Sequence, residues 1–167
     1  TSLNKLAAGD TTVTQISDVD IPEFLSDVVI LDNFVYVSEL DSGRFFRSEP
    51  IVGSQDPEFT SAQVYTAEFA PDTLQRLISL NGALFVLGRN STEIWQNKSD
   101  GTGPVRVSAN SLGIEEKDTL AVLSDDYLHM NELRHIVNRK GEILNAAMLD
   151  AFSDLGSISS AFAFLYT

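Results

Sequence analysis

The feature that most constrains the fold is a pattern of apolar runs and turns that occurs three times along the chain. Each copy has an apolar run, a tight polar turn, a second run, another turn and a third run. The second copy is the clearest, with runs at 77–80, 83–88 and 92–96 and Asn81-Gly82 between the first two. Asn-Gly is the pair that a two-residue hairpin turn prefers, because both of its residues tolerate positive φ. We therefore expect each copy to form a small antiparallel sheet.

The other two copies, at 28–47 and 120–138, have the same order of runs and turns, but their turn residues favour a hairpin less strongly. The equivalent residues Leu31, Leu80 and Leu123 are separated by 49 and 43 residues. A period of about 40–50 residues with several strands in each repeat is typical of β-propeller blades. The sequence thus predicts a mainly β fold of propeller-like antiparallel blades. The expected blade units are at about 28–48, 74–97 and 119–142.

Three blades are too few for a closed ring, because propellers have about four to eight. The chain also begins at Thr1 without methionine and ends at Thr167 directly after an apolar run. We therefore expect residues 1–167 to form a single propeller-like domain that is a fragment of a longer chain. The pattern leaves one alternative open, which is a set of unrelated β-meanders in a sandwich.

The segments outside the repeats predict connections and a different C-terminal part. Residues 49–71 are expected to form a long loop that leaves the first blade, and residues 101–104 to form a turn. Asn145 can cap a short helix, because apolar residues follow it at helical spacing. Residues 157–166 then alternate like a strand, with Phe162, Phe164 and Tyr166 mainly on one side. A helix plus a strand is thus expected at about 145–166.

Charge and composition exclude several classes of protein. The formal net charge is −13, and an acidic surface repels phosphate, which argues against a protein that grips nucleic acid through a basic patch. It remains compatible with a wall past which DNA slides. The chain has no cysteine, so disulfides, thiol nucleophiles and cysteine-based zinc sites are excluded. No apolar stretch approaches the ~18 residues of a membrane span, so no membrane contact is expected.

Patterns that carry catalysis or bind metals are also missing. His129 and His135 are the two histidines, and they are not at a spacing typical of metal ligands. There is no G-x-S-x-G motif, and the glycines at 101 and 103 lack the Lys-Ser/Thr ending of a phosphate-binding loop. We therefore expect a protein that is not an enzyme, with no catalytic residue, no cofactor and no metal.

Trp95 is the single tryptophan and lies late in the second repeat. Successive side chains of a strand point to opposite faces, so Trp95 is expected on the same face as Glu93 and opposite Ile94. A large aromatic side chain in such a run is more often buried for packing than exposed for a ligand.

Two stretches carry a resemblance beyond hairpin chemistry. The first, residues 31–48, reads LDNFVYVSELDSGRFFRS, and the second, residues 84–97, reads LFVLGRNSTEIWQN before a Pro-Val-Arg segment at 104–106. In order and spacing they resemble the packaged-DNA stabilisation proteins, or tail accessory proteins, of short-tailed bacteriophages. One departure is Ala83-Leu84, where members of that family often have an aromatic residue. The resemblance is carried by Gly43, Arg44, Phe45, Asn81, Gly82, Gly88, Arg89, Ser91, Thr92, Glu93, Trp95, Pro104 and Arg106.

The resemblance implies a structural role in a virion. Such proteins form a homo-oligomeric ring, the tail hub or nozzle below the portal, and are assembled in the bacterial host cytoplasm. Their strands build a scaffold, and their loops contact other tail proteins and the portal or adaptor proteins. DNA passes through their channel as cargo, and they help to retain the packaged genome. No catalytic residue is needed for this role.

The sequence leaves a second functional class open, a propeller-type binding module that recognises a protein or a glycan through its loops. A glycosidase built on a propeller would need two carboxylates that converge on one bond. No pair of acidic residues in the chain has a spacing that requires such a site.

Overall fold

The protein is described by a computed structural model that covers residues 3–5, 11–53, 55–115, 117–122, 126–130 and 135–144. These residues form antiparallel sheets, and the only helix among them is the 3₁₀ turn η1 (Lys117–Thr119). Within these ranges no helix has the length and apolar character needed to cross a membrane. The helix and strand expected at about 145–166 lie outside the described residues.

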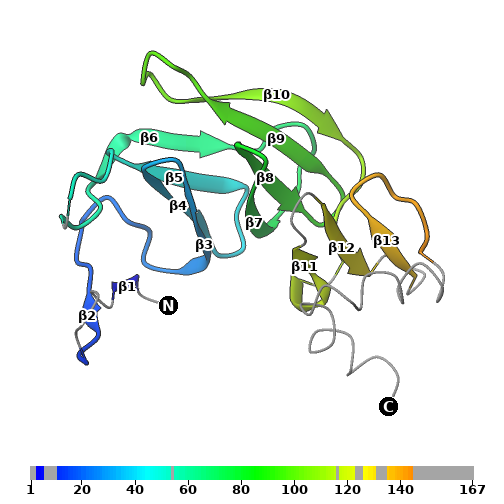
Figure 1. Cartoon of the computed structure of the whole chain (residues 1–167), viewed down its shortest axis with the longest axis horizontal. Helices are drawn as coiled ribbons and strands as arrows, with labels where there is room; N and C mark the ends of the chain where they lie inside the picture. The colour runs from blue at the N-terminus through cyan, green and yellow to red at the C-terminus, as the bar shows by residue number, and fades with distance from the viewer. Residues whose placement is uncertain are drawn as a thin grey trace.

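The first repeat forms a four-stranded sheet in which each strand pairs with the next along the chain (Figure 1). Asp32 adopts a positive φ of 54° in the turn between its first two strands. A small hairpin, β1 (Asn4–Lys5) with β2 (Thr14–Gln15), precedes this sheet. The four strands of the first sheet are β3 (Leu25–Leu31), β4 (Phe34–Glu39), β5 (Arg44–Ser48) and β6 (Phe59–Thr66).

The second repeat forms an equivalent four-stranded sheet. Asn81 and Gly82 have φ values of 52° and 72°, so both residues of the predicted turn have the positive φ that a type I′ turn requires. The hairpin expected there is confirmed. The strands are β7 (Leu74–Leu80), β8 (Ala83–Gly88), β9 (Thr92–Asn97) and β10 (Pro104–Asn110).

The third repeat forms a smaller sheet with the same antiparallel order. Its strands are β11 (Ala121–Val122), β12 (Tyr127–Met130) and β13 (Ile136–Asn138). After β13 the chain turns at Gly141, and Ile143 makes an antiparallel bridge to Val137. The mainly β, antiparallel prediction is confirmed, and the three sheets do not close into a ring within the described residues.

The predicted units end too early, because each of the first two sheets has a fourth strand that the sequence did not indicate. The segment at 49–71, expected to be a loop, contains β6, and the turn at 101–104 leads into β10. Phe59 is the only buried residue of β6 and Pro104 the only buried residue of β10. Apolar periodicity reports burial, so an edge strand with little buried surface leaves little pattern to recognise.

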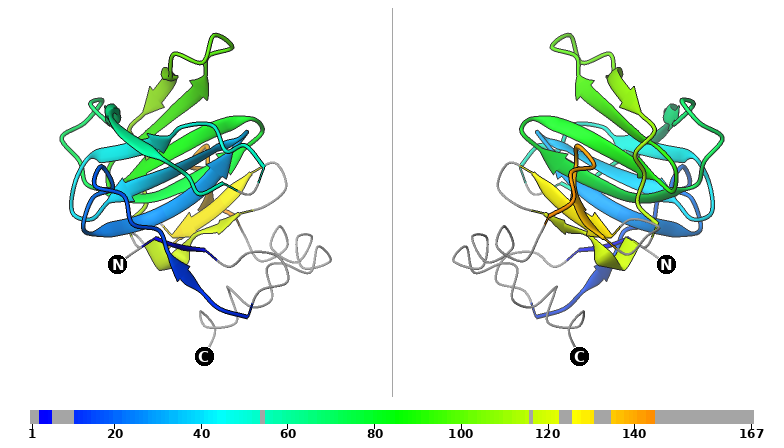
Figure 2. Two further views of the ribbon diagram at one scale, coloured as in Figure 1. Left: turned by 90° about the vertical axis from the view of Figure 1, so that its left-hand side faces the viewer. Right: turned by 90° about the vertical axis from the view of Figure 1, so that its right-hand side faces the viewer.

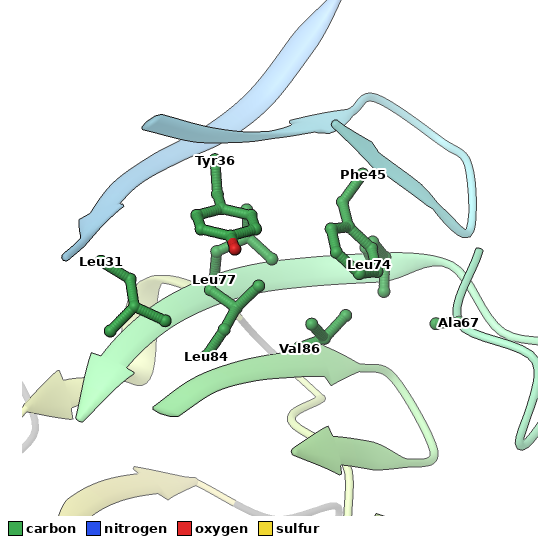
Figure 3. Close-up of a cluster of buried hydrophobic side chains, with 8 residues drawn as sticks. All are labelled: Leu31, Tyr36, Phe45, Ala67, Leu74, Leu77, Leu84 and Val86. Carbon is green, nitrogen blue, oxygen red and sulfur yellow. The ribbon is translucent and has the colours of Figure 1, made fainter. Parts of the chain in front are cut away.

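The three sheets stack face to face, with the second sheet between the other two (Figures 1 and 2). One apolar core lies between the first and second sheets (Figure 3). A second core lies between the second and third sheets and includes Phe85 and Tyr127, whose rings meet edge to face. The first core consists of Leu31, Tyr36, Phe45, Ala67, Leu74, Leu77, Leu84 and Val86.

Strand β8 shows why the stack forms, because all six of its residues are buried. Leu84 and Val86 belong to the core shared with the first sheet, whereas Phe85 and Leu87 belong to the core shared with the third. Alternate residues of a strand point to opposite faces, so a strand that is apolar throughout needs a neighbour on both sides. The run Ala83–Gly88 therefore requires a three-layer arrangement.

Leu84→Ala is expected to lower the free energy of unfolding by about 2–5 kcal/mol, because it leaves a cavity in the core between the first two sheets. Urea denaturation followed by tryptophan fluorescence measures the change. The control is Val107→Ala on β10, where the side chain is half exposed, and its expected effect is within about 0.5 kcal/mol. Equal effects of the two variants would contradict the assignment of this core.

Candidate functional site

Two motif residues of the second sheet, Trp95 and Arg106, bind the carboxylate of a third, Glu93, and we call this group the Glu93 centre. Its Oε1 accepts hydrogen bonds from the backbone N–H of Phe69 (2.6 Å) and from Nη1 of Arg106 (3.2 Å). Its Oε2 accepts a hydrogen bond from Nε1 of Trp95 (3.0 Å). The centre thus joins β9 and β10 to the connection between the first and second sheets.

Strand geometry places these groups together. Glu93 and Trp95 are two residues apart on β9, so they share a face, as the sequence predicts. Arg106 lies directly opposite Trp95 in the register of β9 and β10. The register shifts between Arg106 and Ser108, where a bulge interrupts the ladder. The expectation that Glu93 and Trp95 lie on one face is confirmed by the bond between them.

The Glu93 centre combines a buried anion with a cation that remains in contact with solvent. The side chain of Glu93 is 1% exposed and that of Arg106 is 40% exposed. A buried carboxylate is tolerated only when its oxygens have hydrogen-bond donors. The indole and the Phe69 amide are therefore as important to this group as the guanidinium.

Trp95 also connects the second sheet to the first. Its ring meets that of Phe45 edge to face, with the centroids 5.2 Å apart, and that of Tyr65 with the centroids 6.1 Å apart. Phe45 stacks in turn on Tyr65 at 5.4 Å. Such pairs add to the stabilisation from buried area alone. The motif residue Phe45 of the first repeat and the motif residue Trp95 of the second therefore belong to one aromatic cluster.

The turn between β8 and β9 is held by the carboxylate of Asp72. Its oxygens accept hydrogen bonds from the backbone N–H of Asn90 (2.6 Å), the side-chain amide of Asn90 (3.3 Å) and the hydroxyl of Ser91 (3.2 Å). A Cβ on Gly88 would lie 2.3 Å from one of these oxygens. Glycine at position 88 thus allows the carboxylate to approach the turn. Asp72 was not recognised from the sequence, because it is 18 residues from Asn90.

The turn between β8 and β9 also binds the segment that leads to the third sheet. The hydroxyl of Thr92 donates to the carbonyl of Leu112 (2.5 Å), and the N–H of Ile114 donates to the carbonyl of Gly88 (2.9 Å). A Cβ on Gly113 would lie 2.1 Å from the carbonyl oxygen of Arg89. Thr92 and Gly88 therefore help to position the third sheet relative to the second.

The remaining motif residues lie outside the Glu93 centre and make none of the hydrogen bonds to Asp72. The carbonyl of Gly43 accepts the N–H of Ala67 (2.9 Å), and Pro104 is buried at the start of β10. Arg44 forms a bidentate ion pair with the carboxylate of Glu39. This pair holds the pKa of the Glu39 carboxyl below its usual value. Arg89 is exposed and lines a small cavity of about 160 Å³. The other residues that line this cavity are Ser26, Leu40, Asp41, Leu74, Gln75, Glu115 and Asp118.

Arg47 is a buried cation that does not belong to the motif residues. Its guanidinium lies over the ring of Phe34, 4.4 Å from the centroid, and Nη2 donates to the carbonyl of Gly101 (3.2 Å). Nε and Nη1 have no hydrogen-bond partner among the described residues. Arg47 is two residues after Phe45 on β5, so alternation places it on the core face of the strand. This two-residue spacing from Phe45 is the sequence signal that Arg47 is buried.

Burial also shifts the pKa of several tyrosines and of His129. Burial raises the pKa of Tyr36 to about 12, although the charge of Arg47 and the hydrogen bond to Asn97 oppose this shift. Burial lowers the pKa of His129, and a hydrogen bond with the backbone of Gly113 opposes that shift. His129 lies on β12 against Tyr127, with the ring centroids 5.8 Å apart.

The arrangement is suited to holding sheets together. Glu93, Asp72 and Thr92 each use their side-chain oxygens to bind backbone or side-chain donors and acceptors of another segment. Within the described ranges, no three His, Cys, Asp or Glu side chains are grouped in a way that could hold a metal ion. His129 lies on β12, and His135 directly precedes β13.

Comparison with protein-family models and with curated proteins found no match to this chain.

Glu93→Ala is expected to lower the free energy of unfolding by about 3 kcal/mol, because three donors lose their acceptor inside the protein. Arg106→Ala is expected to cost less than Glu93→Ala, because the Trp95 indole and the Phe69 amide still bind the carboxylate. Urea denaturation at neutral pH compares the two, with the exposed residue Glu23→Ala as the control. A larger loss for Arg106→Ala would show that the ion pair dominates.

Gly113→Ala is expected to lower the free energy of unfolding by more than about 2 kcal/mol, because the added Cβ collides with the backbone of Arg89. Since the strain falls where the third sheet meets the second, amide hydrogen exchange of β11, β12 and β13 is expected to increase most. The exposed neighbour Ser111→Ala serves as the control. Faster exchange spread evenly over all three sheets would argue against this docking contact.

Stability is expected to fall at alkaline pH because of Tyr36. The unfolded state loses the phenol proton near the ordinary pKa of 10.0, whereas the folded state keeps it until about pH 12. The free energy of unfolding therefore decreases as pH rises through that window. Urea midpoints measured at rising pH test this, and Tyr36→Phe is expected to flatten the decline. An unchanged slope in that variant would assign the effect to other groups.

Proposed function

We propose that this chain is part of the structural tail hub or nozzle of a short-tailed bacteriophage, built of propeller-like blades. The observation that carries the proposal is the ordered set of motif residues that resembles the packaged-DNA stabilisation family. Phe45, Trp95 and Arg106, from two separate stretches of that set, meet in or beside one buried cluster. Buried residues that join two sheets stabilise a rigid scaffold, and a rigid scaffold is what a tail hub requires.

The layered arrangement also supports the proposal. Three antiparallel sheets follow one another along the chain, and the first strands of the first two sheets, β3 and β7, lie against each other. In a propeller, successive blades pack face to face around a central axis. The three sheets are the blades of this proposal, and further blades would complete the ring.

The charge of the chain fits a passage for DNA. The formal net charge is −13, and a negatively charged wall repels the phosphate backbone. In the proposed hub, DNA is a passing cargo, while loops at the ends of the sheets contact other tail proteins and the portal or adaptor. The protein is then a homo-oligomer located in the virion.

A second candidate is a binding module that recognises a protein or glycan through its loops. The cavity lined by Arg89, Asp41, Glu115 and Asp118 favours it, because polar and charged groups from several turns border one hollow. Its volume of about 160 Å³ is small for a ligand site, which keeps this candidate second.

Electron microscopy of the purified full-length protein tests the two candidates. The hub is expected to form rings of identical subunits, alone or when mixed with the portal protein of the same virus. A stable monomer that retains a sugar or peptide on an array would reject the hub. Arg89→Ala is the matched variant: it is expected to leave ring formation unchanged, whereas a binding module would lose its ligand.

A further inference from the structure

His129 is a buried titratable side chain at the contact between the second and third sheets. It lies on β12, the central strand of the third sheet, and is 3% exposed. Tyr127, two residues earlier on the same strand, belongs to the apolar core between these two sheets. Residues two apart in a strand share a face, so His129 also faces the second sheet. The centroids of the two rings are 5.8 Å apart.

The hydrogen bonding of the imidazole indicates which nitrogen carries the proton. The ring bonds the backbone of Gly113, and this bond raises the pKa of His129, so the ring is the donor and the carbonyl of Gly113 is the acceptor. Nδ1 is buried and has no hydrogen-bond partner within the part of the chain that the structure describes. The donor is therefore Nε2–H, and Nδ1 carries the unprotonated lone pair.

The acceptor of this bond belongs to the contact that docks the third sheet. A Cβ on Gly113 would lie 2.1 Å from the carbonyl oxygen of Arg89, and the N–H of the next residue, Ile114, donates to Gly88. The segment is thus held on one side by the turn between β8 and β9 and on the other side by His129. A change at His129 acts directly on the join between the two sheets.

No charged group among the described residues serves as a counter-ion for His129. Asp126, just before β12, pairs with Arg139, just after β13, at 3.6 Å. Asp118 of η1 is exposed, and together with Glu115 it lines the small cavity. The pKa of His129 is lowered by burial, and the backbone hydrogen bond is what opposes this shift. A carboxylate close to the ring would raise the pKa instead.

We propose that protonation of His129 in mildly acidic solution releases the third sheet from the second. The proton would add to Nδ1, where it creates both a charge and an N–H donor without an acceptor inside the protein. Neither is tolerated in an apolar contact, whereas both are satisfied by water once the sheet moves away. The inference does not rest on the proposed tail function, because it follows from the surroundings of one side chain.

The direction of the pH effect follows from proton linkage. In the released state the imidazole binds a proton near its ordinary pKa of 6.5, whereas in the docked state burial lowers that pKa. The docked state therefore keeps its full stability above pH 6.5 and loses it as pH falls below that value. Because a single proton is involved, the equilibrium constant for release rises by at most about tenfold for each pH unit.

The first two sheets are expected to stay packed over the same range of pH. The core that they share contains apolar residues and no histidine, and its members come from β3, β4, β5, β7 and β8 together with Ala67. The Glu93 centre joins them through a carboxylate, an indole, a guanidinium and a backbone amide. None of these groups gains a proton near the ordinary pKa of histidine. The effect is thus local to the third sheet.

Amide hydrogen exchange of the full chain at about pH 7.5 and about pH 5.5, corrected for intrinsic rates, tests this proposal. Protection of β12 and β13 is expected to fall by about threefold to tenfold at the lower pH, while protection of β8 does not change. His129→Gln, which keeps an amide donor for Gly113 but cannot be protonated, is expected to remove the fall. The matched control is His135→Gln, at the other histidine of the chain, which is exposed and is expected to leave the fall unchanged.

A second measurement needs no substitution at His129. The ring C–H resonances of the two histidines are followed by NMR from neutral to acidic pH, and His135→Gln identifies which resonance belongs to His129. The His129 resonance is expected to titrate below pH 6.5 and together with the loss of protection in β12. The proposal is overturned if His129 titrates at or above 6.5, if β8 loses protection equally, if His129→Gln keeps the pH effect, or if His135→Gln removes it.

Discussion

The structure depends on one constraint: its small sheets are apolar on both faces. In the second sheet, Leu84 and Val86 point to one side while Phe85 and Leu87 point to the other, so neither side can face water. A sheet of four short strands cannot bury both of its faces alone, and stacking against neighbours is the solution that removes this apolar surface from water. The three-layer order and the cores on both faces of the second sheet follow from that requirement.

Polar groups then set how the layers meet. Apolar contact is not directional, whereas hydrogen bonds to buried groups are, so the Glu93 centre and the Asp72 carboxylate determine the register between segments. Glu93 binds the connection from the first sheet, and the turn at Gly88 binds the connection to the third. Several of the motif residues, among them Phe45, Glu93 and Trp95, thus lie where the first and second sheets join.

Local patterns predicted most of the strands and little of the site. The hairpin at Asn81-Gly82 follows from turn chemistry, and the common face of Glu93 and Trp95 follows from strand alternation. Strands β6 and β10 were missed because edge strands bury few side chains and so show little apolar periodicity. The partners of Glu93 were only half predictable: Trp95 is two residues away, but Phe69 is 24 residues away in a loop.

The sequence by itself determined the class of fold, the number of repeats and the places of the main turns, because these depend on residues close together in the chain. Tertiary structure alone decided that Asp72 would hold the turn at Asn90, that Gly113 would lie against Arg89, and that Arg47 would donate to the carbonyl of Gly101. Each of those contacts joins segments that no turn or period connects. They exist only because stacking of the sheets brings distant parts of the chain within bonding distance.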